Sequence, residues 1–194
     1  PLYSSICQCG ERMNNFIECY HTSISCGSII NYFNADHRTC EGKLGGRIDH
    51  ALKHSTDIRC RLNDVAYQQY NDLIYPQLVS GLQSYAGKYE FLMDISSWRI
   101  YNNYNLQYYG EGEGYHVLHC EHEMETPAQY RILAWMIYLN DAQCGTYFPH
   151  QDITLTPKEG DLWVWPAFWT HAHRGVTPNV GDKYIATGWC EFTR

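Results

Sequence analysis

Residues 131–166 read RILAWMIYLNDAQCGTYFPHQDITLTPKEGDLWVWP and carry the strongest structural signal in the chain. Apolar runs with β-branched and aromatic residues open and close this stretch, at 131–139 and 161–165, and such residues favour strands. Between them, the links NDAQCG and TPKEG contain the asparagine, glycine and proline that are typical of turns. The stretch therefore predicts short strands joined by tight connections.

The same pattern continues on both sides of this stretch. Residues 98–109 and 184–190 are rich in aromatic and β-branched side chains and predict two further strands. Turns are expected at GEGEG and TPNVG. Residues 38–61 are rich in glycine and charge, and they predict a segment made mostly of loops.

Two helices are expected nearer the N-terminus. One spans 23–36, begins at Ser23 and places its isoleucines and phenylalanine on one face. The other spans 64–85, where apolar residues recur at spacings of three and four, and Pro76 should kink it. Helices followed by many short strands predict a mainly β fold with flanking helices, of the α+β class. This pattern is typical of helices packed on a β-sandwich or a jelly roll. The fold that we expect, given the family resemblance described below, is a double-stranded β-helix (jelly roll, cupin-like) with the N-terminal helices packed on one sheet.

Length and composition narrow the class of protein. The 194 residues favour a single domain, 1–194, with a helical N-terminal support region over 1–95 and a jelly-roll core over 96–194. The net charge of −7 argues against binding of phosphate backbones, so nucleic acid is not expected as a partner.

No apolar run reaches the ~18 residues of a membrane span. The N-terminus lacks the apolar stretch of a signal peptide, and we expect a cytoplasmic protein. The nine cysteines form no CxxC pair, and together with the missing export signal this predicts free thiols.

Two His-x-acid pairs are candidates for a metal site, HCE at 119–121 and HQD at 150–152. Non-haem iron oxygenases hold their metal by two histidines and one carboxylate on one side of the ion. Residues i and i+2 of a strand point to the same side, so either pair supplies two ligands and needs a distant third. His119 lies 54 residues before His173, enough for several strands, whereas His150 lies only 23 before it. The spacing favours 119–121, and 150–152 is interpreted as a solvated turn.

The residues alone leave the third ligand open. His171 and His173 in THAHRG are both suitable, because two residues this close in a strand face the same way. His116 and His122 are interpreted as partly exposed residues or as hydrogen-bonding neighbours of the ligands.

From about Arg99 to Phe192, the sequence resembles the prolyl 4-hydroxylase-like branch of the 2-oxoglutarate/Fe(II) dioxygenases. Three motifs carry the resemblance, in order: the Gly-rich YGEGEGYHVLHCE, the strand RILAWMIYLND, and a lysine ten residues after His173. The family places a lysine or arginine ten residues after its last histidine ligand. The resemblance therefore selects His173, because His171 lies twelve residues before Lys183.

The resemblance also assigns roles to site residues. The Fe(II) ligands and catalytic residues are His119, Glu121 and His173, and the co-substrate residues are Lys183, Tyr138 and Tyr109. Lys183 and the hydroxyl of Tyr138 are implied to hold the far carboxylate of 2-oxoglutarate, with Tyr109 in the same pocket. The chain departs from the branch at Glu121, where aspartate is usual, and in the turn 143–146, which is a weaker match.

The implied reaction couples oxidative decarboxylation of 2-oxoglutarate, to succinate and CO2, to hydroxylation of a substrate C–H bond by O2. Ascorbate is an expected reductant. Peptidyl proline is the nearest analogy for the substrate, while a free amino acid, another small molecule or a nucleobase stays open. A jelly-roll binding module and a zinc-loaded cupin-type isomerase are alternatives, but neither gives a reason for Lys183 beside Tyr138. A halogenase is disfavoured, because Glu121 fills the position that a halide needs.

Overall fold

The computed structural model describes residues 15–124, 128–178 and 180–193. Its main element is a seven-stranded antiparallel sheet in the order β1-β8-β5-β10-β4-β3-β2. The strands are β1 (Glu18–His21), β2 (Cys40–Glu41), β3 (Thr56–Arg61), β4 (Trp98–Tyr109), β5 (Arg131–Tyr138), β8 (Asp161–Pro166) and β10 (Lys183–Phe192). The four strands expected from the pattern, at 98–109, 131–139, 161–165 and 184–190, are thus present with nearly the expected bounds.

Burial on both faces explains why β5 reads as an unbroken apolar run. Leu133, Trp135 and Ile137 join the core on the helical side of the sheet. Ala134 and Met136 join the second core on the opposite side, so successive residues alternate between two buried layers. Such a strand shows no polar alternation in its sequence.

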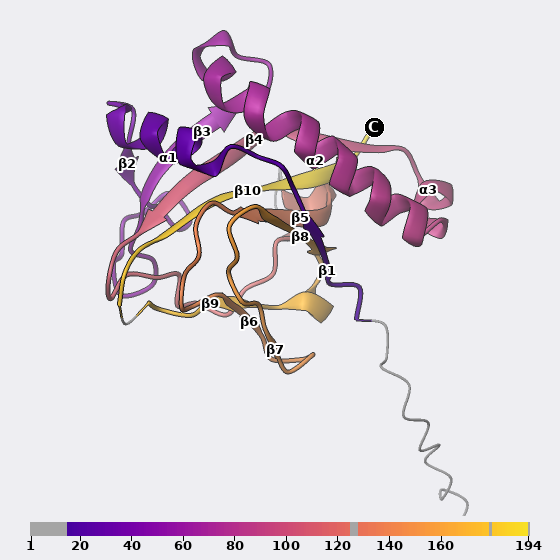
Figure 1. Cartoon of the computed structure of the whole chain (residues 1–194). Helices are drawn as coiled ribbons and strands as arrows, with labels where there is room; N and C mark the ends of the chain where they lie inside the picture. Colours follow the sequence, from indigo (N-terminus) through magenta and orange to yellow (C-terminus); the bar gives the residue numbers. More distant parts are fainter. Residues whose placement is uncertain (1–14, 125–127, 179, 194) are drawn as a thin grey trace, which may run out of the picture.

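A three-stranded sheet in the order β7-β6-β9 lies across the interior from the main sheet (Figure 1). Its strands are β6 (Thr146–Phe148), β7 (Ile153–Thr154) and β9 (Arg174–Gly175). An isolated bridge between His119 and His173 adds a further link on this side. The two layers enclose the second core, in the double-stranded β-helix arrangement that the sequence predicts.

The helices cover the outer face of the main sheet (Figure 1). They are α1 (Cys26–Ala35), α2 (Gln68–Lys88) and α3 (Phe91–Ile95), with 3-10 turns η1 (Val65–Tyr67), η2 (Ala128–Tyr130) and η3 (Trp169–His171). The Asp64 side chain accepts a hydrogen bond from Ala66 N at 3.0 Å and starts η1, which leads into α2. Helix α2 continues through Pro76. Packing of α2 on β8 is close, since a Cβ at Gly81 would lie 2.3 Å from Leu162 Cδ2.

The structure corrects the expectation for the first 95 residues. This region is not only a helical support, because it contributes β1, β2 and β3 to the main sheet. The loop expected over 38–61 contains β3, which pairs with β4 along six residues, Thr56 to Arg61. Ile58 and Cys60 are its buried apolar positions and alternate with the charged residues Asp57, Arg59 and Arg61. Two apolar residues alone are a weak signal for a strand. Pairing with the long neighbouring strand β4 stabilises β3 in addition.

The thiol prediction is confirmed for every cysteine in the described part of the chain, since all of these are free. Cys7 and Cys9 lie outside the described residues. Within the same described ranges, no helix is both long and apolar enough to cross a membrane.

Candidate active site

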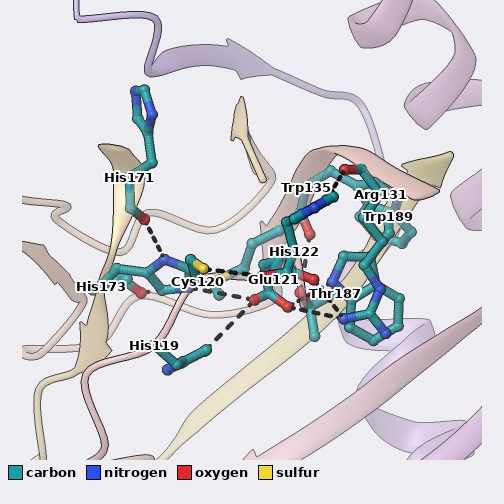
Figure 2. A network of polar contacts seen from close by, with 12 residues as sticks. His119, Cys120, Glu121, His122, Arg131, Trp135, His171, His173, Thr187 and Trp189 are labelled. Carbon is teal, nitrogen blue, oxygen red and sulfur yellow. Dashed lines mark hydrogen bonds and ion pairs between the residues drawn. The ribbon is translucent and has the colours of Figure 1, made fainter. Parts of the chain in front are cut away.

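Three side chains converge on the inner side of the main sheet. His119 Nε2 lies 3.6 Å from Glu121 Oε1, and His173 Nε2 lies 3.4 Å from the same oxygen (Figure 2). One ligand atom from each residue falls within 4.8 Å of the other two. Two imidazole nitrogens and one carboxylate oxygen are the donor set of a non-haem Fe(II) site, so these residues fit that metal.

Backbone pairing brings the distant segments together. His119 N donates to His173 O at 3.0 Å, and His173 N donates back to His119 O at 2.8 Å. Glu121 N donates to Ala167 O at 3.0 Å, just after β8. The three residues are therefore held by main-chain hydrogen bonds that do not depend on a metal.

Each imidazole is oriented by its other nitrogen. His119 Nδ1 lies 2.8 Å from Val117 O. His173 Nδ1 lies 2.9 Å from His171 O (Figure 2). A backbone carbonyl only accepts, so in both rings Nδ1 carries the hydrogen. Nε2 of each ring therefore faces Glu121 and is the nitrogen left to bind a metal.

The two oxygens of Glu121 have different partners. Oε1 faces both histidines, whereas Oε2 accepts a hydrogen bond from Trp189 Nε1 at 2.7 Å and lies 3.5 Å from Arg131 Nη1. The Arg131 guanidinium also stacks on the Trp189 ring, 3.7 Å from the ring centroid. Burial opposes ionisation of Glu121, but hydrogen bonds from His119 and His173 hold the pKa of its carboxyl well below the usual range. The carboxylate is therefore charged and presents a single oxygen to the metal position.

A cavity of about 340 Å³ opens from these residues. Its walls include all three candidate ligands, with Tyr109, Thr146 and Lys183. This volume lies near the lower end of the range for small-molecule pockets, about 300–1,000 Å³. The cavity suits a compact ligand bound beside the metal position.

Lys183 is the first residue of β10 and is only 3% exposed. Its Nζ lies 4.9 Å from the centroid of the Tyr109 ring, and none of the described residues accepts a hydrogen bond from it. Burial lowers the pKa of its ammonium to about 8. A buried cation that faces a cavity without a partner is the arrangement expected of an anion-binding site.

The two tyrosines assigned from the resemblance lie differently. Tyr109 lines the cavity, and its hydroxyl donates to Gln107 Oε1 at 3.1 Å. Tyr138 faces the same interior but is fully buried behind the cavity wall, with its hydroxyl 3.1 Å from Thr146 Oγ1. Thr146 lines the cavity. Tyr138 and Thr146 are thus linked at the cavity, and the contact of the Tyr138 hydroxyl with 2-oxoglutarate stays a prediction.

The competing histidines lie away from the metal position. The buried His171 ring points away from the His119, Glu121 and His173 side chains (Figure 2). Its Nε2 lies 2.8 Å from Asn15 O, and its Nδ1 lies 2.9 Å from Thr170 Oγ1. His150 and Asp152 are exposed in the turn after β6, as interpreted from the sequence. His122 Nδ1 lies 3.2 Å from Arg131 O, and His116 Nδ1 lies 3.3 Å from Thr177 Oγ1.

The sequence patterns gave no reason to select a second group of buried polar residues at the cavity. Lys53 Nζ lies 2.9 Å from Asp57 Oδ2, and Asp57 Oδ1 accepts hydrogen bonds from Ser55 Oγ at 2.8 Å and Gln107 Nε2 at 3.0 Å. Gln107 is also the acceptor for Tyr109. The only hint in the sequence is a set of polar residues at the start of an unrecognised strand.

Comparisons with known proteins agree with this geometry. Residues 104–191 match the model of the 2OG-Fe(II) oxygenase superfamily. No curated protein sequence matches the chain. Among solved structures, the viral collagen prolyl hydroxylase of Paramecium bursaria Chlorella virus-1, bound to 2-oxoglutarate, has a TM-score of 0.66 at 18% identity, over 92% of this chain and 97% of that one.

Two cellular enzymes are also similar in fold. A prolyl 4-hydroxylase of Pseudomonas putida has a TM-score of 0.66 at 12% identity, over 92% of this chain and 93% of that one. A prolyl hydroxylase of Trichoplax adhaerens, in complex with a peptide fragment of hypoxia inducible factor, has a TM-score of 0.67 at 14% identity, over 92% and 84%. The matched segment 104–191 contains the three converging residues and Lys183, so the site lies in the part of the chain that is similar to the 2OG-Fe(II) oxygenase superfamily.

Proposed function

We propose that this 2-oxoglutarate-dependent dioxygenase hydroxylates a prolyl residue of a peptide, with His119, Glu121 and His173 as iron ligands. The observation that carries the proposal is a single cavity that joins a His-Glu-His cluster to an unpaired buried lysine. When bound, Fe(II) supplies the oxidative decarboxylation of 2-oxoglutarate to succinate and CO2 and the transfer of an oxygen atom to the substrate.

The protein residues have separate tasks in this proposal. His119 and His173 offer Nε2, and Glu121 offers Oε1, so three donors occupy one side of the metal and leave the other side open. Lys183 pairs with the distal carboxylate of 2-oxoglutarate, which gives its ammonium a partner that none of the described residues provides. Thr146 and Tyr109 add neutral groups to the same cavity.

The proposed substrate rests on fold and on the shape of the cavity. The three solved structures of similar fold are described as prolyl hydroxylases, and one was solved with a peptide. The Trp189 indole lines this cavity beside Glu121. A flat aromatic face there offers apolar contact to a compact ring such as pyrrolidine.

Succinate release tests the proposal. The protein is incubated with Fe(II), 2-oxoglutarate, O2 and ascorbate, together with prolyl peptides, matched peptides with alanine for proline, and free proline. We expect succinate and a peptide 16 Da heavier, the mass of one oxygen atom, only with the prolyl peptides. Succinate release driven instead by free proline or by the alanyl peptides would overturn the assignment of peptidyl proline.

A further inference from the structure

Lys53 is a second buried lysine in the cavity, and the proposed reaction has no task for it yet. Its side chain is 8% exposed and its Nζ is hydrogen-bonded to Asp57 Oδ2 at 2.9 Å. An ammonium carries three N–H donors, so two remain after the contact with Asp57. None of the described residues accepts either of them.

The position of Lys53 is fixed from several sides. Asp57 is itself held by Ser55 and Gln107, so the carboxylate that orients Lys53 is not free to turn. The backbone at Gly42 packs against the stem of Lys53, because a Cβ there would lie 3.1 Å from Lys53 Cε and 2.1 Å from Ser55 Oγ. A charged group ordered this tightly at a cavity wall is arranged before any ligand arrives.

Lys53 lies at the metal end of the cavity. Its backbone forms a bridge with Tyr115, and its Nζ lies 5.8 Å from the centroid of the Tyr115 ring. Tyr115 in turn stacks on His119, with ring centroids 4.0 Å apart and planes 18° apart. Lys183, by contrast, lies over the Tyr109 ring.

Two lysines at different places in one cavity match the chemistry of 2-oxoglutarate. This co-substrate is a dianion, with one carboxylate beside its keto group and the other at the far end of the molecule. We infer that Lys53 binds the carboxylate next to the keto group, while Lys183 takes the distal one. The inference rests on the proposed function, because it requires 2-oxoglutarate in this cavity, and it makes Lys53 a residue that selects 2-oxo acids.

Truncated ligands separate the two lysines. Pyruvate keeps the 2-oxo acid group but lacks the distal carboxylate, whereas 4-oxopentanoate keeps the keto group and the distal carboxylate but lacks the near one. The dissociation constants of 2-oxoglutarate and both fragments are measured by NMR titration or calorimetry on protein loaded with an inert divalent metal. Binding, not turnover, is the readout.

The variant Lys53→Met/Asp57→Asn removes the ion pair without leaving an unpaired buried charge. It should weaken the binding of 2-oxoglutarate and pyruvate by about 10- to 100-fold, which corresponds to the loss of one charge-assisted hydrogen bond. The dissociation constant of 4-oxopentanoate should be unchanged. Lys183→Met should weaken the binding of 2-oxoglutarate and 4-oxopentanoate and leave the binding of pyruvate unchanged. The matched control Lys158→Met/Asp141→Asn makes the same changes in an exposed pair, 3.4 Å apart, and should bind all three ligands as the wild type does.

Each remaining outcome has a definite meaning. Wild-type affinity for 2-oxoglutarate in the Lys53→Met/Asp57→Asn variant, or an equal loss for all three ligands, would overturn the inference and leave Lys53 with a structural role. If that variant does not fold, Lys53→Gln, whose amide still donates to Asp57, is tested by the same titrations. Failure of the wild type itself to bind 2-oxoglutarate would instead reject the proposed function.

Discussion

Glu121 shows how one side chain is prepared for a metal. Its Oε1 faces His119 and His173, while its Oε2 is held by the Trp189 indole at 2.7 Å and lies near Arg131. Glutamate has one more rotatable bond than the aspartate usual in this branch. The hydrogen bond from Trp189 restricts that added freedom and keeps the carboxylate in place.

Removal of this hydrogen bond should weaken metal binding. Trp189→Phe keeps an aromatic ring but deletes the N–H, and we expect metal affinity to fall about 10- to 100-fold, as for other groups that orient ligands. Trp163→Phe is the control, because Trp163 also flanks the second core but its Nε1 has no hydrogen-bond partner. Equilibrium dialysis with Mn(II) measures both variants. Equal affinity in the two would show that Trp189 does not position Glu121.

The pKa of Lys183 predicts a pH dependence for co-substrate binding. Burial lowers this pKa to about 8, so the ammonium is protonated below pH 8 and loses its proton above it. Only the charged form pairs with the distal carboxylate, so the affinity for 2-oxoglutarate should fall about tenfold per pH unit above pH 8.

Calorimetry of the metal-loaded protein between pH 7 and about 9.5 measures this profile. Lys183→Arg provides the control, because a guanidinium stays charged throughout this range and should give a flat profile. A wild-type profile that is equally flat would contradict the role of Lys183.

Part of the site follows from the sequence because it depends on local spacing. His119 and Glu121 are two residues apart, and Lys183 follows His173 by ten, so pattern and family resemblance select them. Lys53 and Thr146 could not be selected in this way. Their place in the cavity wall arises from contacts between segments far apart in the chain, which no spacing records.

Strand β10 joins the two ends of the site, because it begins at Lys183 and carries Trp189 near its other end. Gly188 lies between them, directly under Trp135, and a Cβ there would lie 2.5 Å from Trp135 Cζ2. This close approach lets the fully buried Trp135 ring pack against the strand.

A methyl group at Gly188 should therefore disturb the sheet. Gly188→Ala is expected to destabilise the fold by about 1–3 kcal/mol, the usual cost of overpacking a core. Gly87→Ala is the contrasting variant: Gly87 lies in α2 with nothing within 4 Å of its Cβ position, and alanine there should stabilise by about 0.5–1 kcal/mol. Urea unfolding measures both changes, and a neutral Gly188→Ala would show that the sheet adapts easily.

Elements differ in how well the sequence predicts them. The bounds of β4, Trp98–Tyr109, agree with the expectation because five aromatic residues and an isoleucine are spread along these twelve positions. The short strands β6, β7 and β9 were not predicted, since two or three residues carry no measurable periodicity. Their existence depends on pairing across the interior.

The two sheets enclose the second core, and the helices cover the outer face of the main sheet (Figure 1). Because β1, β2 and β3 from the first 95 residues are paired into the main sheet, we predict that residues 1–194 unfold as one domain. Thermal unfolding should show a single transition by both tyrosine fluorescence and far-UV circular dichroism. Mn(II) with 2-oxoglutarate at 100 times its dissociation constant should stabilise that transition by about 2.7 kcal/mol. A separate early transition for the helices would contradict the single-domain prediction.

The joint binding of metal and co-substrate is the core of the proposal for this molecule. Under anaerobic conditions, Fe(II) and then 2-oxoglutarate are titrated into the wild type and into Glu121→Ala, and bound amounts are measured by calorimetry. We expect one Fe(II) per wild-type chain and one 2-oxoglutarate that binds tightly only after the metal, with both lost or strongly weakened in Glu121→Ala. Binding of 2-oxoglutarate that is independent of metal, or full Fe(II) occupancy in Glu121→Ala, would contradict the assignment of this site.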